Sequence, residues 1–101
     1  MDPDLPDLTI ADVVVSIAGR DAGKLFYVLE TDGLWLSLVN GKDRTIEKPK
    51  RKKIKHTNKV LRSETRVAAK LRNGDKVLNS ELRRDLAYLS REMQSKPWEV
   101  N

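Results

Sequence analysis

Apolar residues between positions 12 and 39 are grouped in short runs that are typical of β-strands. Residues 12–17 form a β-branched run, residues 25–29 and 34–39 form strands in which successive side chains alternate between two faces, and each run is bounded by a turn that contains glycine. A fourth short strand is predicted over residues 52–56, where Ile54 is the single apolar residue. Short strands at this close spacing predict a small, strongly curved barrel or meander.

The period changes to that of helices after Thr57. Ser63-Glu64 is expected to cap a short helix that stops at Asn73-Gly74. Asn79-Ser80-Glu81 opens a longer helix, which Pro97 ends. The apolar stripes of these helices are formed by Val67, Ala68 and Leu71 in the first, and by Leu82, Leu86, Leu89 and Met93 in the second.

These patterns predict a mostly β fold with C-terminal helices and divide the chain into three parts. Residues 1–9 lack periodicity, contain two prolines and are predicted to form a flexible N-terminal arm. Residues 10–60 form the β-barrel, and residues 61–101 form a helical extension that packs on it. The helices are expected to cover an open face or an end of the barrel, because their apolar stripes need a partner.

Charge is concentrated in one segment of the chain. Residues 42–62 contain ten basic and two acidic residues, whereas the net charge of the whole chain is +5. The rest of the chain is therefore slightly acidic. Charge that is segregated in this way indicates a polyanionic partner or a basic tail.

Several functional classes are disfavoured by composition. The chain has no cysteine and a single histidine, so thiolate and histidine-rich metal sites are excluded, and no cofactor is expected. No nucleophile elbow or phosphate-binding P-loop motif occurs, and we predict that the protein is not an enzyme. No apolar stretch approaches the length of a membrane span, and the acidic N-terminus is unlike a signal peptide. We therefore expect a cytoplasmic monomer that binds neither membranes nor a small-molecule substrate.

The segment GRDAGKL, residues 19–25, is the first candidate binding element. Gly19 and Gly23 are expected to adopt positive φ or to allow close backbone approach. Backbone N–H groups together with Arg20 and Lys24 would suit a phosphate. A hairpin turn with solvated charges explains the same residues.

The stretch DVVVSIAGRDAGKLFYVLE resembles the KOW motif, in which Gly, a basic residue, Asp, any residue, Gly and Lys stand between two strands. KOW motifs occur in ribosomal proteins and transcription elongation factors. The wider match, residues 10–60, resembles the fourteen-e type of large-subunit ribosomal proteins and their bacterial stand-alone relatives. The family position before the first strand, often glycine, is Ala11 here.

The resemblance implies a Src-homology-3-like β-barrel, the KOW fold, that binds RNA, typically ribosomal RNA, without catalysis. In the family, the loop that matches residues 19–24 contacts RNA or a neighbouring protein. Asp21 is expected to have a structural role in that loop, with its carboxylate accepting loop N–H groups.

The run KPKRKKIKH, residues 48–56, is the second candidate element. We predict that it lies along a phosphate backbone, although a solvated basic loop or a nuclear localisation signal would have a similar composition. Arg66 and Lys70 share a face of the first helix and either extend this surface or are simply solvated. The predicted RNA-binding residues are Gly19, Arg20, Gly23, Lys24, Lys48, Lys50, Arg51, Lys52, Lys53, Lys55 and His56.

Aromatic residues are less informative. His56 either stacks on a base or is an ordinary surface residue. Trp35 is expected to pack beneath the C-terminal helix, with base stacking as the alternative. The sequence as a whole predicts a ribosome-associated, ribonucleoprotein-type module with a role in translation and with ribosomal proteins as further partners. A protein-interaction module on a ribosomal protein or RNA polymerase, or a duplex DNA-binding module, remains as an alternative.

Overall fold

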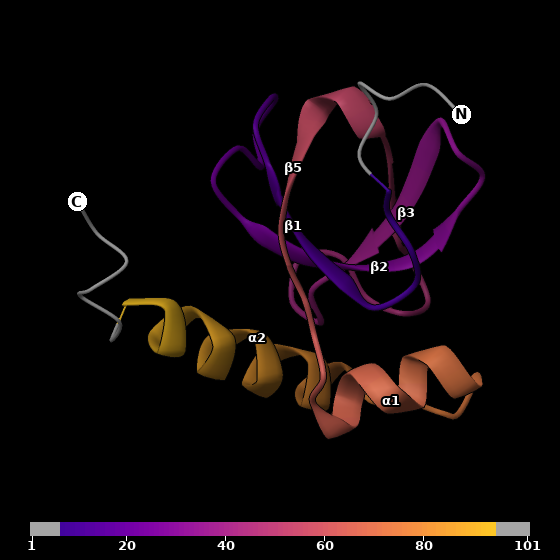
Figure 1. Ribbon diagram of the computed structural model, residues 1–101, viewed down its shortest axis with the longest axis vertical. Helices are drawn as coiled ribbons and strands as arrows, with labels where there is room; N and C mark the ends of the chain where they lie inside the picture. The colour runs from indigo at the N-terminus through magenta and orange to yellow at the C-terminus, as the bar shows by residue number, and fades with distance from the viewer. Residues whose placement is uncertain (1–6, 95–101) are drawn as a thin grey trace.

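The computed structural model describes residues 7–94 and consists of a five-stranded antiparallel sheet followed by two helices (Figure 1). The elements in chain order are β1 (Asp12–Ser16), β2 (Leu25–Thr31), β3 (Trp35–Val39), β4 (Lys50–Lys53), the 3₁₀ turn η1 (Ile54–His56), β5 (Thr57–Arg62), α1 (Arg66–Asn73) and α2 (Asn79–Gln94). The strand order is β4-β3-β2-β1-β5, so β4 and β5 form the two edges. Between residues 7 and 94, no backbone pairing joins β4 to β5.

The fold contains one strand more than the sequence predicts. The strand expected over residues 52–56 lies at Lys50–Lys53 instead, and the three residues that follow form η1. β5 was missed because a bulge interrupts its alternation: Val13 pairs with Leu61 and Val14 with Lys59, which leaves Val60 as an additional residue. This last strand ends at Arg62, two residues beyond the predicted boundary of the β part.

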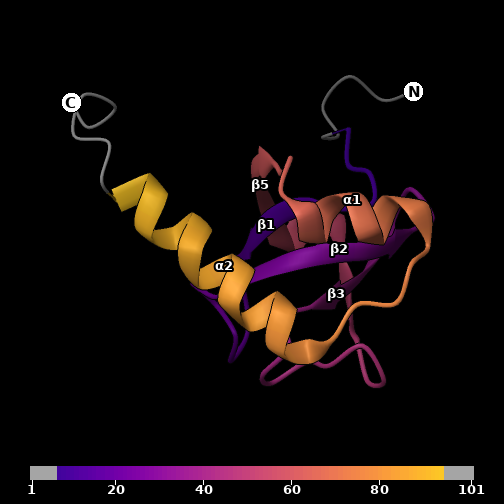
Figure 2. The same cartoon turned by 90° about the horizontal axis from the view of Figure 1, so that it is seen from below.

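Each face of the sheet contributes to a hydrophobic core cluster. On one face, Val13, Tyr27 and Val39 pack with the apolar stripes of α1 and α2 in one cluster. Figure 2 shows the two helices lying across this face of the strands. On the other face, a second cluster is formed by Leu8, Val14, Phe26, Val28, Leu36, Leu38 and Ile54, none of which belongs to α1 or α2. The expectation that the helices cover a face of the β part is confirmed.

The starts of both helices and the end of α1 agree with the sequence prediction to within two residues. Thr65, rather than Ser63 or Glu64, is the N-cap of α1, and its Oγ1 accepts a hydrogen bond from the Ala68 N–H at 3.2 Å. Gly74 follows Asn73 in the left-handed conformation and ends the helix. In α2 the predicted stripe is buried at Leu82, Leu86 and Leu89. The predicted stop at Pro97 lies outside the described residues.

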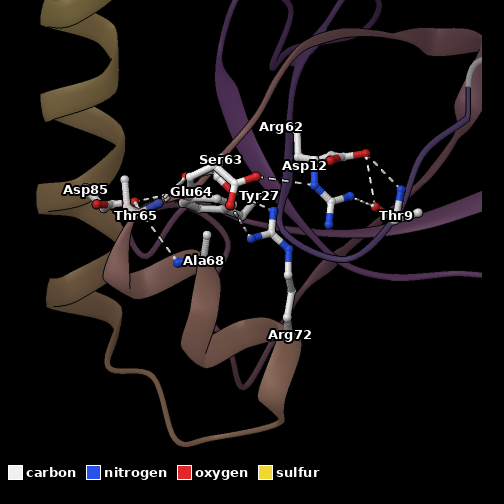
Figure 3. A network of polar contacts seen from close by, with 10 residues as sticks. All are labelled: Thr9, Asp12, Tyr27, Arg62, Ser63, Glu64, Thr65, Ala68, Arg72 and Asp85. Carbon is white, nitrogen blue, oxygen red and sulfur yellow. Dashed lines mark hydrogen bonds and ion pairs between the residues drawn. The ribbon is translucent and has the colours of Figure 1, made fainter.

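A buried tyrosine joins the sheet to both helices (Figure 3). The Tyr27 hydroxyl on β2 donates to Asp85 of α2 and lies 2.8 Å from Ser63 Oγ. Thr65 Oγ1, at the start of α1, donates to the same Asp85 carboxylate at 2.8 Å. Burial, together with the hydrogen bond to Asp85, raises the pKa of Tyr27 to about 12. The tyrosine is therefore a neutral donor over the physiological range.

The segment before β1 is more ordered than predicted. Leu8, which the sequence placed in the flexible arm, is buried in the second cluster. Asp12 Oδ2 accepts a hydrogen bond from the Thr9 N–H at 2.9 Å, and this bond closes a turn before the strand. Ala11 has a φ of 70°, a left-handed conformation that glycine adopts at lower cost. The backbone at this position thus has a geometry that favours glycine, although the residue is alanine.

Candidate nucleic-acid interface

The β1–β2 loop, residues 17–24, is a compact turn. Gly19 and Gly23 have φ values of 80° and 88°, which confirms the expected positive φ. The N–H groups of Ala22, Gly23 and Lys24 donate to backbone carbonyls of Gly19, Ser16 and Asp21, respectively. These three amides are occupied within the protein, so the prediction that loop N–H groups face a phosphate is wrong for them. Attraction of an anion here must come from side chains.

Lys52 occupies the inner side of this loop instead of the protein surface. Its side chain is 8% exposed, and its Nζ lies 2.6 Å from Asp21 Oδ1. The same ammonium group donates to Ser16 Oγ and to the Ala18 carbonyl, both at 2.7 Å. These contacts use all three donors of the group. The assignment of Lys52 to the phosphate-binding surface is therefore corrected: it is a structural residue that fastens the loop to β4.

Asp21 has the structural role that the sequence predicts, but with different partners. Its carboxylate accepts hydrogen bonds from Lys52 and, at 2.8 Å, from the Ser16 hydroxyl. Burial acts to raise the pKa of Asp21, but the hydrogen bonds and the positive charge of Lys52 outweigh burial and hold the pKa below its usual value. The lowered pKa favours the charged form of the Asp21 carboxylate, whose negative charge lies directly beside the Lys52 ammonium group.

The fastening of the loop to β4 brings both candidate elements to one hollow. We call this the basic hollow; it is lined by Ala18, Gly19, Arg20, Asp21, Arg44, Lys50, Lys52 and His56. The described part of the chain contains no carboxylate that forms an ion pair with Arg20, Arg44 or Lys50. Three cations that pair with no carboxylate among the described residues therefore line the hollow together with the Asp21–Lys52 pair.

Arg44 is a member of the basic hollow that sequence reasoning missed. The chain reverses direction in the turn after β3. The N–H groups of Asn40 and Gly41 both donate to the Arg44 carbonyl, at 2.8 and 3.0 Å, and these bonds close the turn. The Asn40 side chain also accepts from the N–H groups of Lys42 and Arg44. The Asn40-Gly41 dipeptide indicates a turn from the sequence alone. The sequence does not indicate that this turn places Arg44 beside the β1–β2 loop.

The alternation of β4 separates the predicted cations onto two faces. Lys50 and Lys52 lie toward the basic hollow, whereas Arg51 and Lys53 approach the ring of Trp35, with distances to the ring centroid of 4.8 and 5.4 Å. Trp35 belongs to neither core cluster, so the expectation that it packs beneath the C-terminal helix is wrong. The basic run therefore forms two separate surfaces on the two sides of one edge strand.

The remaining predicted residues are less closely grouped. Lys24 forms an exposed ion pair with Asp43 at 2.7 Å, which reduces its availability to an anion. Lys48 and Lys55 are exposed, and His56 is half-buried at the end of η1. On α1, Lys70 pairs with Glu81 at 2.9 Å, so it does not extend the basic surface.

Other classes of site are not found in the described ranges. Within residues 7–94, no group of three acidic or histidine side chains could hold a metal ion. None of the helices in this part of the chain is long and apolar enough to cross a membrane. Comparison of the chain with protein-family models and with curated proteins finds no match.

Proposed function

We propose that this protein is an RNA-binding module of the KOW type, associated with the ribosome, that holds ribosomal RNA through the phosphate backbone at the basic hollow. The observation that carries the proposal is the convergence of three segments of the chain on one hollow. The loop supplies Arg20, the turn after β3 supplies Arg44 and β4 supplies Lys50. Within residues 7–94, no carboxylate forms an ion pair with any of the three.

The electrostatics of the basic hollow favour a polyanion. Asp21 lies among the cations, but its charge is offset by Lys52 at 2.6 Å, so it opposes an approaching phosphate only weakly. Each cation that neutralises a phosphate releases a counterion, and this release is the main source of sequence-independent affinity. Such contacts position a protein on folded RNA without reading bases.

We further propose that the sheet curves into a Src-homology-3-like barrel, as the GRDAGKL resemblance implies. The support is the second core cluster, in which Val14, Phe26, Leu36 and Leu38 are fully buried although neither α1 nor α2 packs there. A flat sheet would leave such a face in water. Curvature that brings Ile54 of η1 over this face would account for the burial.

The test is a titration of the full chain with ribosomal RNA fragments at several salt concentrations. We expect the logarithm of the affinity to fall linearly with the logarithm of salt concentration, with a slope of about −2 to −3 for three phosphate contacts. Competition with duplex DNA of equal length should leave most of the RNA bound. A salt-independent interaction with ribosomes would contradict the phosphate proposal and indicate docking on a ribosomal protein.

A further inference from the structure

A second hollow lies on the other side of β4 from the basic hollow. It is lined by Glu30, Thr31, Asp32, Trp35, Leu36, Ser37 and Arg51. β4 is an edge strand that pairs only with β3 among the described strands, and it contributes a residue to each hollow. Consecutive residues, Lys50 and Arg51, line the two hollows.

The position of Trp35 is fixed by its neighbours. Asp32 Oδ1 accepts hydrogen bonds from the N–H groups of Leu34 and Trp35, at 3.0 and 2.8 Å, which orders the β2–β3 turn. The other carboxylate oxygen of Asp32 lies 3.8 Å from Arg51, whose guanidinium is 4.8 Å from the Trp35 ring centroid. Lys53 approaches the same ring at 5.4 Å. The aromatic residue and its cations therefore form a preorganised group.

The chemistry of this second hollow suits a base better than a phosphate. Glu30 and Asp32 place carboxylates on its lining, and these would repel a phosphate. The indole and the guanidinium plane of Arg51, in contrast, offer stacking surfaces, which attract any nucleobase because every base has a π-face. The basic hollow has the opposite character, with cations and without an aromatic residue other than His56.

We propose that an unpaired RNA base stacks on the Trp35–Arg51 group while the phosphates beside it occupy the basic hollow across β4. This inference rests on the proposed RNA binding and adds a substrate class to it, namely RNA with a single-stranded segment. A base that is paired within a duplex cannot present its face to Trp35, so duplex RNA would use the basic hollow alone.

The experiment compares a single-stranded oligonucleotide with a fully paired RNA duplex, both of which are titrated into the full chain. The Trp98→Phe variant leaves Trp35 as the sole tryptophan, and we expect the single strand to quench its fluorescence. Trp35→Leu should lower the affinity for the single strand about tenfold, as the loss of one base stack does, and should change the duplex affinity less than twofold. Tyr88→Leu, which removes an exposed aromatic residue of α2, is the matched control and should change neither affinity.

The outcomes separate this inference from the proposed function. An equal loss of affinity for both RNAs in Trp35→Leu would overturn it, because Trp35 would then act only by holding Arg51. Salt-dependent RNA binding without quenching would also overturn it, while leaving the proposed function intact. Failure of the unmodified protein to bind either RNA would reject both. Circular dichroism and thermal melting establish that each variant is folded.

Discussion

The ammonium group of Lys52 on β4 lies 2.6 Å from the carboxylate of Asp21 in the β1–β2 loop, and both side chains are largely buried. This contact joins segments that are separated by 31 positions in the sequence. It also determines what the loop presents to a partner, because the loop can carry Arg20 to Lys50 only while the two segments are held together. The pair is thus a structural requirement of the basic hollow rather than a part of its binding surface.

Removal of one member of the pair should destabilise the protein. Lys52→Met leaves the Asp21 carboxylate buried without its cation, and we expect a loss of about 3 kcal/mol in the free energy of unfolding. The double variant Asp21→Asn/Lys52→Met removes both charges and should recover a large part of that loss. Urea unfolding of the two variants and the unmodified chain measures both effects. Equal stability of the single and double variants would show that the charges are not coupled.

The same pair predicts a dependence of stability on acid. The pKa of Asp21 is lower in the folded state than in the unfolded state, where a value of about 3.9 is usual. Its stabilising contribution is therefore fully present above that value and is lost as the pH falls through the lower, folded pKa. The unmodified protein should lose stability over this acidic range more steeply than Asp21→Asn/Lys52→Met does. Urea midpoints measured from neutral pH to strongly acidic pH provide the comparison.

The cations of the basic hollow should control the salt dependence of RNA binding. Replacement of Arg20, Arg44 and Lys50 by glutamine should reduce the slope of log affinity against log salt by about 2 to 3, since each lost phosphate contact contributes just under one unit. Affinity at moderate salt should fall more than tenfold. Both quantities come from fluorescence-anisotropy titrations at four or more salt concentrations.

The control for this triple variant has the same net charge. Arg66, Lys76 and Arg84 are exposed cations of the helical part, and their replacement by glutamine changes the total charge by the same amount. If binding depends only on overall charge, the two triple variants will weaken it equally, which would contradict an assignment to the basic hollow.

Much of the sheet could be predicted because short apolar runs between glycine-containing turns specify it. β1 is a run of β-branched residues, β2 carries apolar residues on both faces, and in β3 Leu36 and Leu38 are separated by Ser37. Gly19 and Gly23 adopt the positive φ that their place between two strands indicates. β5 could not be found in this way, because its bulge at Val60 breaks the alternation and the strand is defined only by its pairing with β1.

The division of the basic run was partly visible in the sequence. Lys52 and Ile54 are two positions apart, so the apolar residue predicted to face inward places Lys52 on the same side. The net charge of residues 50–53 does not reveal this alternation, because a charge count assigns all four residues to a single surface. The location of Arg44 and the pairing of Lys24 with Asp43 depend instead on the three-dimensional path of the turn after β3, which no local pattern specifies.

The network around Tyr27 predicts a loss of stability in alkali. Its folded pKa of about 12 lies above the usual value of 10, so its contribution is fully present below pH 10 and is lost as the pH rises toward 12. The expected loss over this range is on the order of 2 kcal/mol. The Tyr88→Phe variant leaves Tyr27 as the sole tyrosine, so that tyrosinate absorbance then reports its ionisation directly.

A control separates this effect from general alkaline unfolding. In Tyr27→Phe the ionisable hydroxyl is absent, and stability should decline less between pH 10 and pH 12 although it is lower at neutral pH. The lower starting value follows because Asp85 loses the hydroxyl donor of Tyr27. If the stability of Tyr27→Phe and that of the unmodified protein decline in parallel over this pH range, the alkaline loss does not come from ionisation of Tyr27.

Gly41 is required by close contact between the turn after β3 and the start of α2. Its φ is 77°, and a Cβ atom at this position would lie 2.2 Å from the Asn79 carbonyl oxygen and 3.0 Å from Leu82 Cβ. Gly41→Ala must therefore displace α2 as well as adopt a left-handed conformation, and we expect a loss of about 3 kcal/mol or more. Gly33→Ala provides the comparison, since Gly33 has a φ of 94° with nothing within 4 Å of a Cβ atom. That variant should lose about 1 to 2 kcal/mol, from backbone conformation alone. If urea unfolding gives equal losses for the two variants, the contact between the turn and α2 does not contribute to stability.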